Sequence, residues 1–262
     1  MIRAYHAELV KLVRRKVVLV TAAVIAVFGV GGAAIVLAAA KPAAEAGAGR
    51  GLSLEQLAGA GGGTEVFRTA ASFAGTFLFV VFVGAIAVEF SRGTIRTMLL
   101  RQPRRVRLLA GKLAALLTCA AVALAATEGI TWLAARVLAP GNGVATHGWT
   151  TLDAAGAAAT DFGAVLLWIT GYAVLGTTVA VLLRSVPLAL AVGIAWAGPF
   201  EHLVQNAWTP AGKVFPGLLL EAFVAGGTPD VAAGRALVTV AVYVTIAALV
   251  ASVVFARRDV TA

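Results

Sequence analysis

The chain has 262 residues, of which 60% are apolar and 13% charged, and its mean hydropathy is +0.94. Soluble domains carry about a quarter charged residues, so this composition excludes an ordinary soluble domain and indicates an integral membrane protein. The net charge of +9 is interleaved with apolar runs of membrane length, which favours a role in membrane topology over a nucleic-acid-binding surface.

The N-terminal segment, residues 1–16, precedes the first apolar run and is predicted to form an amphipathic helix. One face holds Ile2, Tyr5, Leu9, Leu12 and Val13, and the remainder holds Arg3, Glu8, Lys11, Arg14 and Arg15. Such a helix lies along a membrane surface. The apolar run that follows is longer than the 7–15-residue core of a signal peptide, so we expect it to be retained as a membrane helix.

Six apolar runs are long enough to cross about 30 Å of hydrocarbon as α-helices. They cover residues 17–40, 70–88, 113–135, 162–183, 186–204 and 236–256. We therefore predict an all-α integral membrane protein whose six transmembrane helices form one domain over residues 1–262. Only Arg184 and Ser185 separate the fourth and fifth runs, and Pro187 follows, which predicts a tight helical hairpin there.

The first outer loop, residues 41–69, is rich in Ala and Gly, and we expect a flexible tether with a short helix at Leu52–Leu57. Orientation follows from the basic residues, because cytoplasmic loops carry the excess of Lys and Arg. Of the 21 in the chain, 15 lie in residues 1–16, 89–112, 184 and 257–258. Both termini are therefore predicted to be cytoplasmic.

Residues 89–112 form the largest predicted cytoplasmic loop and hold seven basic residues. Their simplest role is to anchor the loop to anionic lipid, at about 1 kcal/mol per residue. Ile95, Met98, Leu99 and Val106 predict an apolar stripe. Because Pro103 interrupts it, we expect a short helix from Ser91, its N-cap, to Arg101, then a break at Gln102–Pro103 and a second helix that continues into the third span.

The order of residues in this loop resembles the conserved cytoplasmic segment of type-2 ATP-binding-cassette (ABC) permeases. The resemblance rests on Glu89, Gly93, Thr94, Leu99, Leu100, Pro103, Arg104, Arg105 and Lys112. The basic N-terminus and the closing FARRD are similar to the ends of the same family.

This resemblance implies the permease subunit of a bacterial exporter in the cytoplasmic membrane, paired with a second copy or a related permease. A separate cytoplasmic ATPase would bind ATP and Mg, and the loop would carry the coupling helix that docks into it. The coupling residues would be Glu89, Ser91, Arg92, Gly93, Thr94, Arg96, Leu99, Pro103, Arg104, Arg105 and Lys112. The sequence has no G-x-x-x-x-G-K-[ST] loop, so no cofactor is expected on this subunit itself.

Four polar residues fall toward the predicted outer side, namely Glu128, Asp161, Glu201 and His202. They either line a shared outer vestibule or lie at the headgroup boundary, and Glu128 is the deepest, about 15 residues into its span. Glu201 and His202 diverge by about 100° on a helix, which disfavours a catalytic pair. With three His, one Cys and no H-E-x-x-H, the sequence predicts neither an enzyme nor a metal site.

Residues 205–235 are broken up by Pro210 and Pro216 and are too interrupted for an ordinary span. A re-entrant or interfacial hairpin on the outer side fits better, with Phe215–Val224 as part of it, and relatives in the permease family often have such helices.

The apolar runs suit a lipidic, peptidic or amphipathic drug-like cargo. The alternative function is a stand-alone membrane binding or immunity protein without an ATPase. It explains the topology equally well but gives the pattern in residues 89–112 no purpose.

Overall fold

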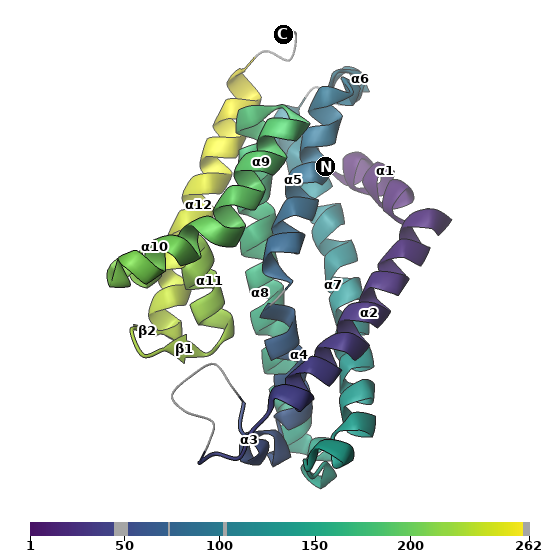
Figure 1. Ribbon diagram of the computed structural model, residues 1–262. Helices are drawn as coiled ribbons and strands as arrows, with labels where there is room; N and C mark the ends of the chain where they lie inside the picture. The colour runs from purple at the N-terminus through teal and green to yellow at the C-terminus, as the bar shows by residue number, and fades with distance from the viewer. Residues whose placement is uncertain (45–51, 73, 102–103, 259–262) are drawn as a thin grey trace. The chain divides into compact units, whose positions relative to one another are not determined.

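The computed structural model describes residues 1–44, 52–72, 74–101 and 104–258. In these residues the chain is helical apart from short turns, a parallel bridge between Lys41 and Ser53, and one small hairpin, β1 (Gly227–Thr228) paired antiparallel with β2 (Val231–Ala232) (Figure 1). Packing divides the chain into two compact units. Unit 1 comprises Met1–Val13, Ala74–Ala120 and Leu167–Ala262, and unit 2 comprises Arg14–Phe73 and Ala121–Leu166.

Among the residues that the structure describes, four helices are long and apolar enough to cross a membrane, which confirms an all-α protein of membrane type. They are α2 (Arg15–Ala39), α7 (Arg105–Leu138), α8 (Leu152–Leu183) and α12 (Ala233–Arg257). The shortest have 25 residues, about 37 Å at 1.5 Å per residue, which exceeds the hydrocarbon thickness. These helices contain the predicted first, third, fourth and sixth spans.

The predicted second and fifth spans are not single straight helices. Helix α4 (Gly62–Ser72) belongs to unit 2 and α5 (Gly75–Ser91) to unit 1, and they count as a fifth span only if they are taken together. In place of the fifth run, α9 (Val186–Ala195) is followed by a π-helical turn at Trp196–Phe200 and by α10 (Glu201–Ala207). Pro199 lies in that turn and removes a backbone donor, which explains the break.

Unit 1 also contains α1 (Ile2–Leu12), α6 (Thr94–Arg101), the 3₁₀ turn Thr209–Lys213 and α11 (Pro216–Val224). Its centre is an aromatic group in which Trp168 meets Tyr172 edge to face at 5.3 Å between ring centroids, and Tyr172 meets Phe79 at 5.7 Å. Helix α5 packs on α9, and α11 packs on α12. Because Gly75 has no Cβ, the Trp168 ring fits against it: an added Cβ would lie 2.5 Å from that ring.

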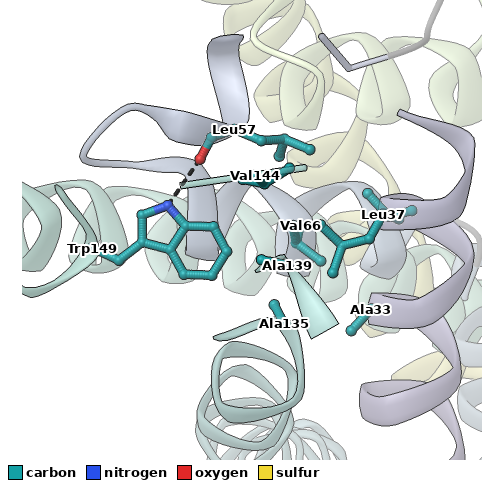
Figure 2. Packing of buried hydrophobic residues seen from close by; sticks show 9 residues of the cluster. Ala33, Leu37, Leu57, Val66, Ala135, Ala139, Val144 and Trp149 are labelled. Atoms are coloured by element: carbon teal, nitrogen blue, oxygen red, sulfur yellow. Dashed lines mark hydrogen bonds between the residues drawn. The ribbon is translucent and has the colours of Figure 1, made fainter. Parts of the chain in front are cut away.

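Unit 2 is built around a cluster of small and branched apolar residues with one tryptophan (Figure 2). Trp149, only 2% exposed, donates its indole N–H to the carbonyl oxygen of Leu57 at 2.8 Å. Leu57 lies in α3 (Leu54–Ala58), which starts with a capping box between Ser53 and Gln56. The short helix predicted at residues 52–57 is thus confirmed with a small shift. The flexible tether is wrong for residues 54–58 and 62–68, which belong to α3 and α4 and include buried side chains.

Candidate functional site

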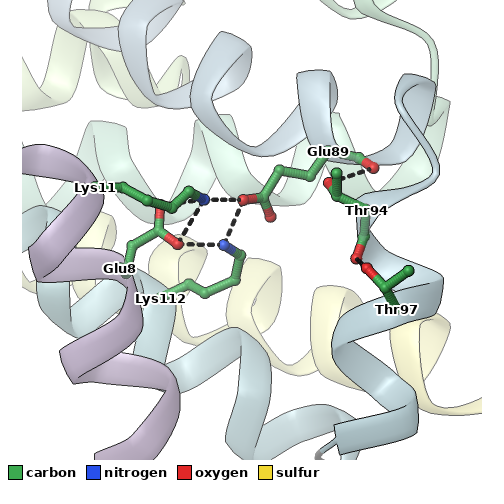
Figure 3. Close-up of polar contacts among 6 residues, drawn as sticks. All are labelled: Glu8, Lys11, Glu89, Thr94, Thr97 and Lys112. Atoms are coloured by element: carbon green, nitrogen blue, oxygen red, sulfur yellow. Dashed lines mark hydrogen bonds and ion pairs between the residues drawn. The ribbon is translucent and has the colours of Figure 1, made fainter.

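Two acidic and two basic side chains meet inside unit 1 and form one ion-pair network, Glu8, Lys11, Glu89 and Lys112 (Figure 3). Lys112 Nζ donates to Glu8 Oε2 at 2.5 Å and to Glu89 Oε1 at 2.6 Å. Lys11 Nζ donates to Glu89 Oε1 at 2.7 Å and to Glu8 Oε2 at 3.0 Å. The side chains of Lys112, Glu89 and Glu8 are 4%, 7% and 10% exposed, whereas that of Lys11 is 46% exposed. The network therefore joins α1, α5 and α7 through largely dehydrated charges.

Helix geometry brings these four residues together. Glu8 and Lys11 are three residues apart on α1 and thus share a face, which also carries the buried Ala4. Gly111 lets α1 lie directly on α7, since a Cβ at this position would be 2.8 Å from the carbonyl oxygen of Met1 and 3.0 Å from Ala4 Cβ. The network can form only because the two helices approach this closely.

The opposite charges of the network stabilise each other's ionised forms. Burial by itself would raise the pKa of Glu8, but the hydrogen bonds and charges of Lys112 and Lys11 outweigh it, and the pKa lies below its usual value. Burial would lower the pKa of Lys11, but the hydrogen bonds that Lys11 donates to Glu89 and Glu8, together with the charges of these carboxylates, outweigh it and raise the pKa. Both pKa shifts, that of Glu8 downward and that of Lys11 upward, favour the ionised forms of these two side chains.

The Gly-Thr pair after α5 makes the turn that starts α6. Gly93 has φ +65°, in the left-handed region that glycine adopts at low cost. Thr94 donates its hydroxyl to the carbonyl oxygen of Glu89 at 3.2 Å, which ties the start of α6 to the network. The predicted N-cap at Ser91 is wrong. Ser91 is the last residue of α5, and its hydroxyl accepts the backbone N–H of Val186 at 3.3 Å.

Helix α6 has one buried face and one exposed face. Ile95 is 3% exposed and Met98 and Leu99 are half-buried, in agreement with the predicted apolar stripe, whereas Leu100 is 87% exposed. Val106 does not continue the stripe, because it lies on α7 and is 42% exposed. The side chains of Arg92, Arg96 and Arg104 are exposed, so the outer face of α6 and its flanks combine positive charge with one leucine. Pro103, the predicted break, lies outside the described residues.

Arg105 links the start of α7 to the end of α12. Its Nη1 donates to the carbonyl oxygen of Arg258 at 2.7 Å, with longer contacts to the carbonyl oxygens of Phe255 and Ala256. Arg258 in turn donates to the carbonyl oxygen of Leu182 at 3.1 Å, at the end of α8. Arg105 thus ties two helix ends together, and its part in ATPase coupling stays a prediction.

The turn between α8 and α9 contacts the end of α5. Arg184 adopts φ +53°, and its guanidinium lies 5.5 Å from the centroid of the Phe90 ring. Burial lowers the pKa of Arg184, and the charges of Arg258 and Arg105 add to this effect. The predicted tight hairpin at residues 184–185 is confirmed. Three segments assigned to one side of the membrane, residues 89–112, 184–186 and 257–258, are in contact within unit 1.

The four polar residues of the predicted outer side fall into different units, so a vestibule shared by all four stays a prediction. In unit 2, Asp161 Oδ1 is 3.4 Å from Arg68, which also pairs with Glu65 at 2.5 Å. Asp161 lies inside α8, nine residues after the start of that helix at Leu152. Glu128 lines a pocket of about 530 Å³ beside Trp132 and Trp149.

Glu201 and His202 belong to unit 1 and contact different partners. Glu201, 2% exposed, accepts the backbone N–H of Leu218 at 2.8 Å and a hydrogen bond from the indole of Trp196. His202 Nε2 lies 3.2 Å from Glu221 Oε2. The carboxylate of Glu201 therefore holds the first turn of α11, while His202 lies against Glu221.

Sequence reasoning found two members of the network, Glu89 and Lys112, and missed the other two. Glu8 and Lys11 were assigned to the polar face of a surface helix. The signal that marks them is Glu8 itself, the only acidic residue among the basic residues of positions 1–16. In the part of the chain that the structure describes, no three His, Cys, Asp or Glu side chains come together as a metal site.

A family model described as "Protein of unknown function (DUF2705)" matches residues 47–261. No curated protein matches the chain significantly.

Proposed function

Because the chain belongs to the DUF2705 family, whose description assigns no activity, its function has to be inferred from its own residues. We propose that it is the permease subunit of an ABC transporter and that a separate cytoplasmic ATPase drives it through α6. The subunit would form the translocation path with a second copy or a related permease. ATP and Mg would bind to the ATPase, and the cargo would be lipidic, peptidic or amphipathic and drug-like.

The observation that carries this proposal is the ion-pair network beneath α6. A loop that only anchors the chain to lipid has no need of buried ion pairs, because exposed basic residues suffice for that role. Here Glu89 accepts hydrogen bonds from Lys11 of α1 and Lys112 of α7, while its backbone carbonyl holds Thr94 at the start of α6. A displacement of α6 would therefore act on α1, α5 and α7 together.

Further contacts of residues 89–112 would pass a movement of α6 on to other helices. Arg105 connects the start of α7 to the last turn of α12, and Ser91 binds the first residue of α9. When the ATPase subunits close on ATP, they would push on the exposed side of α6, and these ties would carry the motion into the helices that form the path. Closure would thereby change the relative populations of inward- and outward-facing states.

The first test is copurification. The tagged chain is extracted from its native membrane in mild detergent, the proteins that accompany it are identified, and ATP hydrolysis is measured. We expect a stoichiometric P-loop ATPase. Purification free of any ATPase across several detergents would overturn the proposal and favour a stand-alone membrane binding or immunity protein.

A charge-reversal variant then tests the docking surface. Arg96→Glu combined with Arg104→Glu reverses two exposed charges beside α6, and we expect at least about tenfold less ATPase in the purified complex. The matched control, Arg136→Glu with Arg235→Glu, reverses two exposed charges on the predicted outer side and should retain the ATPase. Equal copurification by both variants would contradict docking through α6.

A further inference from the structure

A large cavity in unit 1 opens directly beside the ion-pair network. Its volume is about 1250 Å³, and its walls come from α1, α5, α6, α7 and α9. Pockets for small ligands are typically about 300–1,000 Å³, so this one is large enough for more than a headgroup or a metabolite. One part of the wall is apolar, with Val80, Val81, Ala85, Val88, Leu116 and Leu190. The cavity therefore has the amphipathic character of a lipid-binding site.

The charged part of the cavity is net positive. Six charged residues line it, namely Arg3, Glu8, Lys11, Glu89, Arg92 and Lys112. The two carboxylates are already matched by the two lysines of the network. Arg3 and Arg92 remain as additional cationic groups in the lining of the cavity, and both are exposed. An anion is the complementary ligand, and guanidinium groups bind phosphate in a bidentate manner.

The network also leaves hydrogen-bonding capacity beside the cavity. Oε2 of Glu89 is buried and accepts no hydrogen bond within the described residues, and the whole residue is only 5% exposed. Lys112 Nζ carries three protons and donates two of them, to Glu8 and to Glu89 Oε1. In Figure 3 the second oxygen of Glu89 points away from the contact with Lys11. A hydroxyl group satisfies both needs, since it donates to Glu89 and accepts from Lys112.

We propose that this cavity binds one anionic glycerophospholipid with a hydroxyl-bearing headgroup. Its phosphate would meet Arg3 and Arg92, its headgroup hydroxyl would lie between Lys112 and Glu89, and an acyl chain would follow the apolar wall of α5 and α9. The side chain of Val81 is 60% exposed at that wall, so the chain has a way out of the cavity toward surrounding lipid. The site does not depend on the ATPase or on transport.

Titration of the full-length purified protein with defined lipids tests the site. The probes are palmitoyl-oleoyl phosphatidylglycerol and palmitoyl-oleoyl phosphatidylcholine, and native mass spectrometry counts the bound lipid. We expect one phosphatidylglycerol per chain, bound at least about tenfold more tightly than phosphatidylcholine, because only the former has both a net negative charge and headgroup hydroxyls. Glycerol 3-phosphate, which lacks acyl chains, should not displace it.

Two variants test whether the lipid binds in this cavity. A leucine at Gly84 would fill it without moving the backbone, since a Cβ there meets only the side chain of Leu190, at 3.8 Å. Arg3→Gln removes one of the two additional cationic groups. Each should weaken phosphatidylglycerol binding about tenfold, while Arg107→Gln, an exposed arginine that does not line the cavity, should not. Labelling of the single cysteine, Cys119, during heating checks that the variants stay folded.

The outcomes separate the alternatives. Equal binding of the two lipids, or binding unchanged in the Gly84→Leu and Arg3→Gln variants, would identify annular lipid only and overturn the proposal. Displacement by glycerol 3-phosphate would assign the site to a soluble phosphate compound and likewise overturn it. Because no ATPase is present, specific lipid binding would stand even if no ATPase copurified, and its failure would leave the proposed function intact.

Discussion

Removal of the Lys112 charge is the sharpest test of the ion-pair network. Lys112 contacts both carboxylates at 2.5 and 2.6 Å, and its side chain is 4% exposed. Lys112→Met keeps the length of the side chain but leaves Glu8 and Glu89 with Lys11 as their single cation. Loss of one partner from a buried ion pair costs about 3–5 kcal/mol, because the remaining charge stays buried and uncompensated.

The matched variant is Lys11→Met, which removes the same charge from a side chain that is 46% exposed. Water screens that position, so the expected loss is about 1 kcal/mol. Expressed as melting temperature, the two losses correspond to about 10 °C for Lys112→Met and about 3 °C for Lys11→Met. Cys119 is the only cysteine of the chain and lies half-buried in α7. A maleimide dye added during a temperature ramp therefore reports the opening of unit 1 without further engineering.

A double variant tests why Lys112→Met should cost more stability than Lys11→Met. Lys112→Met with Glu89→Gln leaves one neutral pair, Glu8 with Lys11, and should recover about 2 kcal/mol relative to Lys112→Met alone. If the two single lysine variants melted at the same temperature, or if the double variant lost as much as the sum of the single losses, the network would not be the buried, coupled element described here.

Two further predictions concern pH and close packing. The folded pKa of Glu8 lies below the ordinary 4.5, so the stability that Glu8 contributes is complete above about pH 5.5 and is lost as pH falls through the folded pKa. The pKa of Lys11 is raised above 10.5, so the stability that Lys11 contributes is lost only above pH 10.5. The melting temperature should therefore be level between about pH 5.5 and 9.5, and Glu8→Gln should flatten the acid side of the curve. Gly217→Ala should lower the free energy of unfolding by about 1–3 kcal/mol, because the added Cβ would lie 2.5 Å from the fixed carboxylate of Glu201. The control Gly156→Ala has open space around it and should not destabilise the protein. Melting curves of the two glycine variants that coincide would contradict the packing of α11.

The long apolar helices were predictable because their signal is local. Residues 17–40 and 236–256 need no information beyond length and hydropathy, and both fall within long apolar helices in the structure. The fifth run misled for an equally local reason, since Pro199 lies in an apolar stretch whose hydropathy hides the π-helical turn. Residues 54–68 looked like a tether because Ala and Gly dominate, yet Leu57, Val66 and Phe67 are enough to bury α3 and α4 in unit 2.

The candidate site was predictable only in part because its contacts join distant segments. The order of residues from Glu89 to Lys112 pointed to α6 and to the turn at Gly93, where φ is positive. The pairing of Glu8 with Lys112 spans 104 positions, and a helical periodicity cannot show which distant residue a polar face will meet. In the same way, Arg105 reads as one more exposed arginine until the end of α12 lies beside it.

The distance along the chain between the two ends of the network has a consequence for synthesis. At about 5–20 residues per second, Lys112 leaves the ribosome about 5–20 s after Glu8, because 104 positions separate them. During that interval Glu8 has only Lys11, three residues away on its own helix, as a partner within the network. Helix α1 is thus made several seconds before the part of α7 that it contacts through Lys112, while the helices of unit 1 beyond residue 167 are made later still.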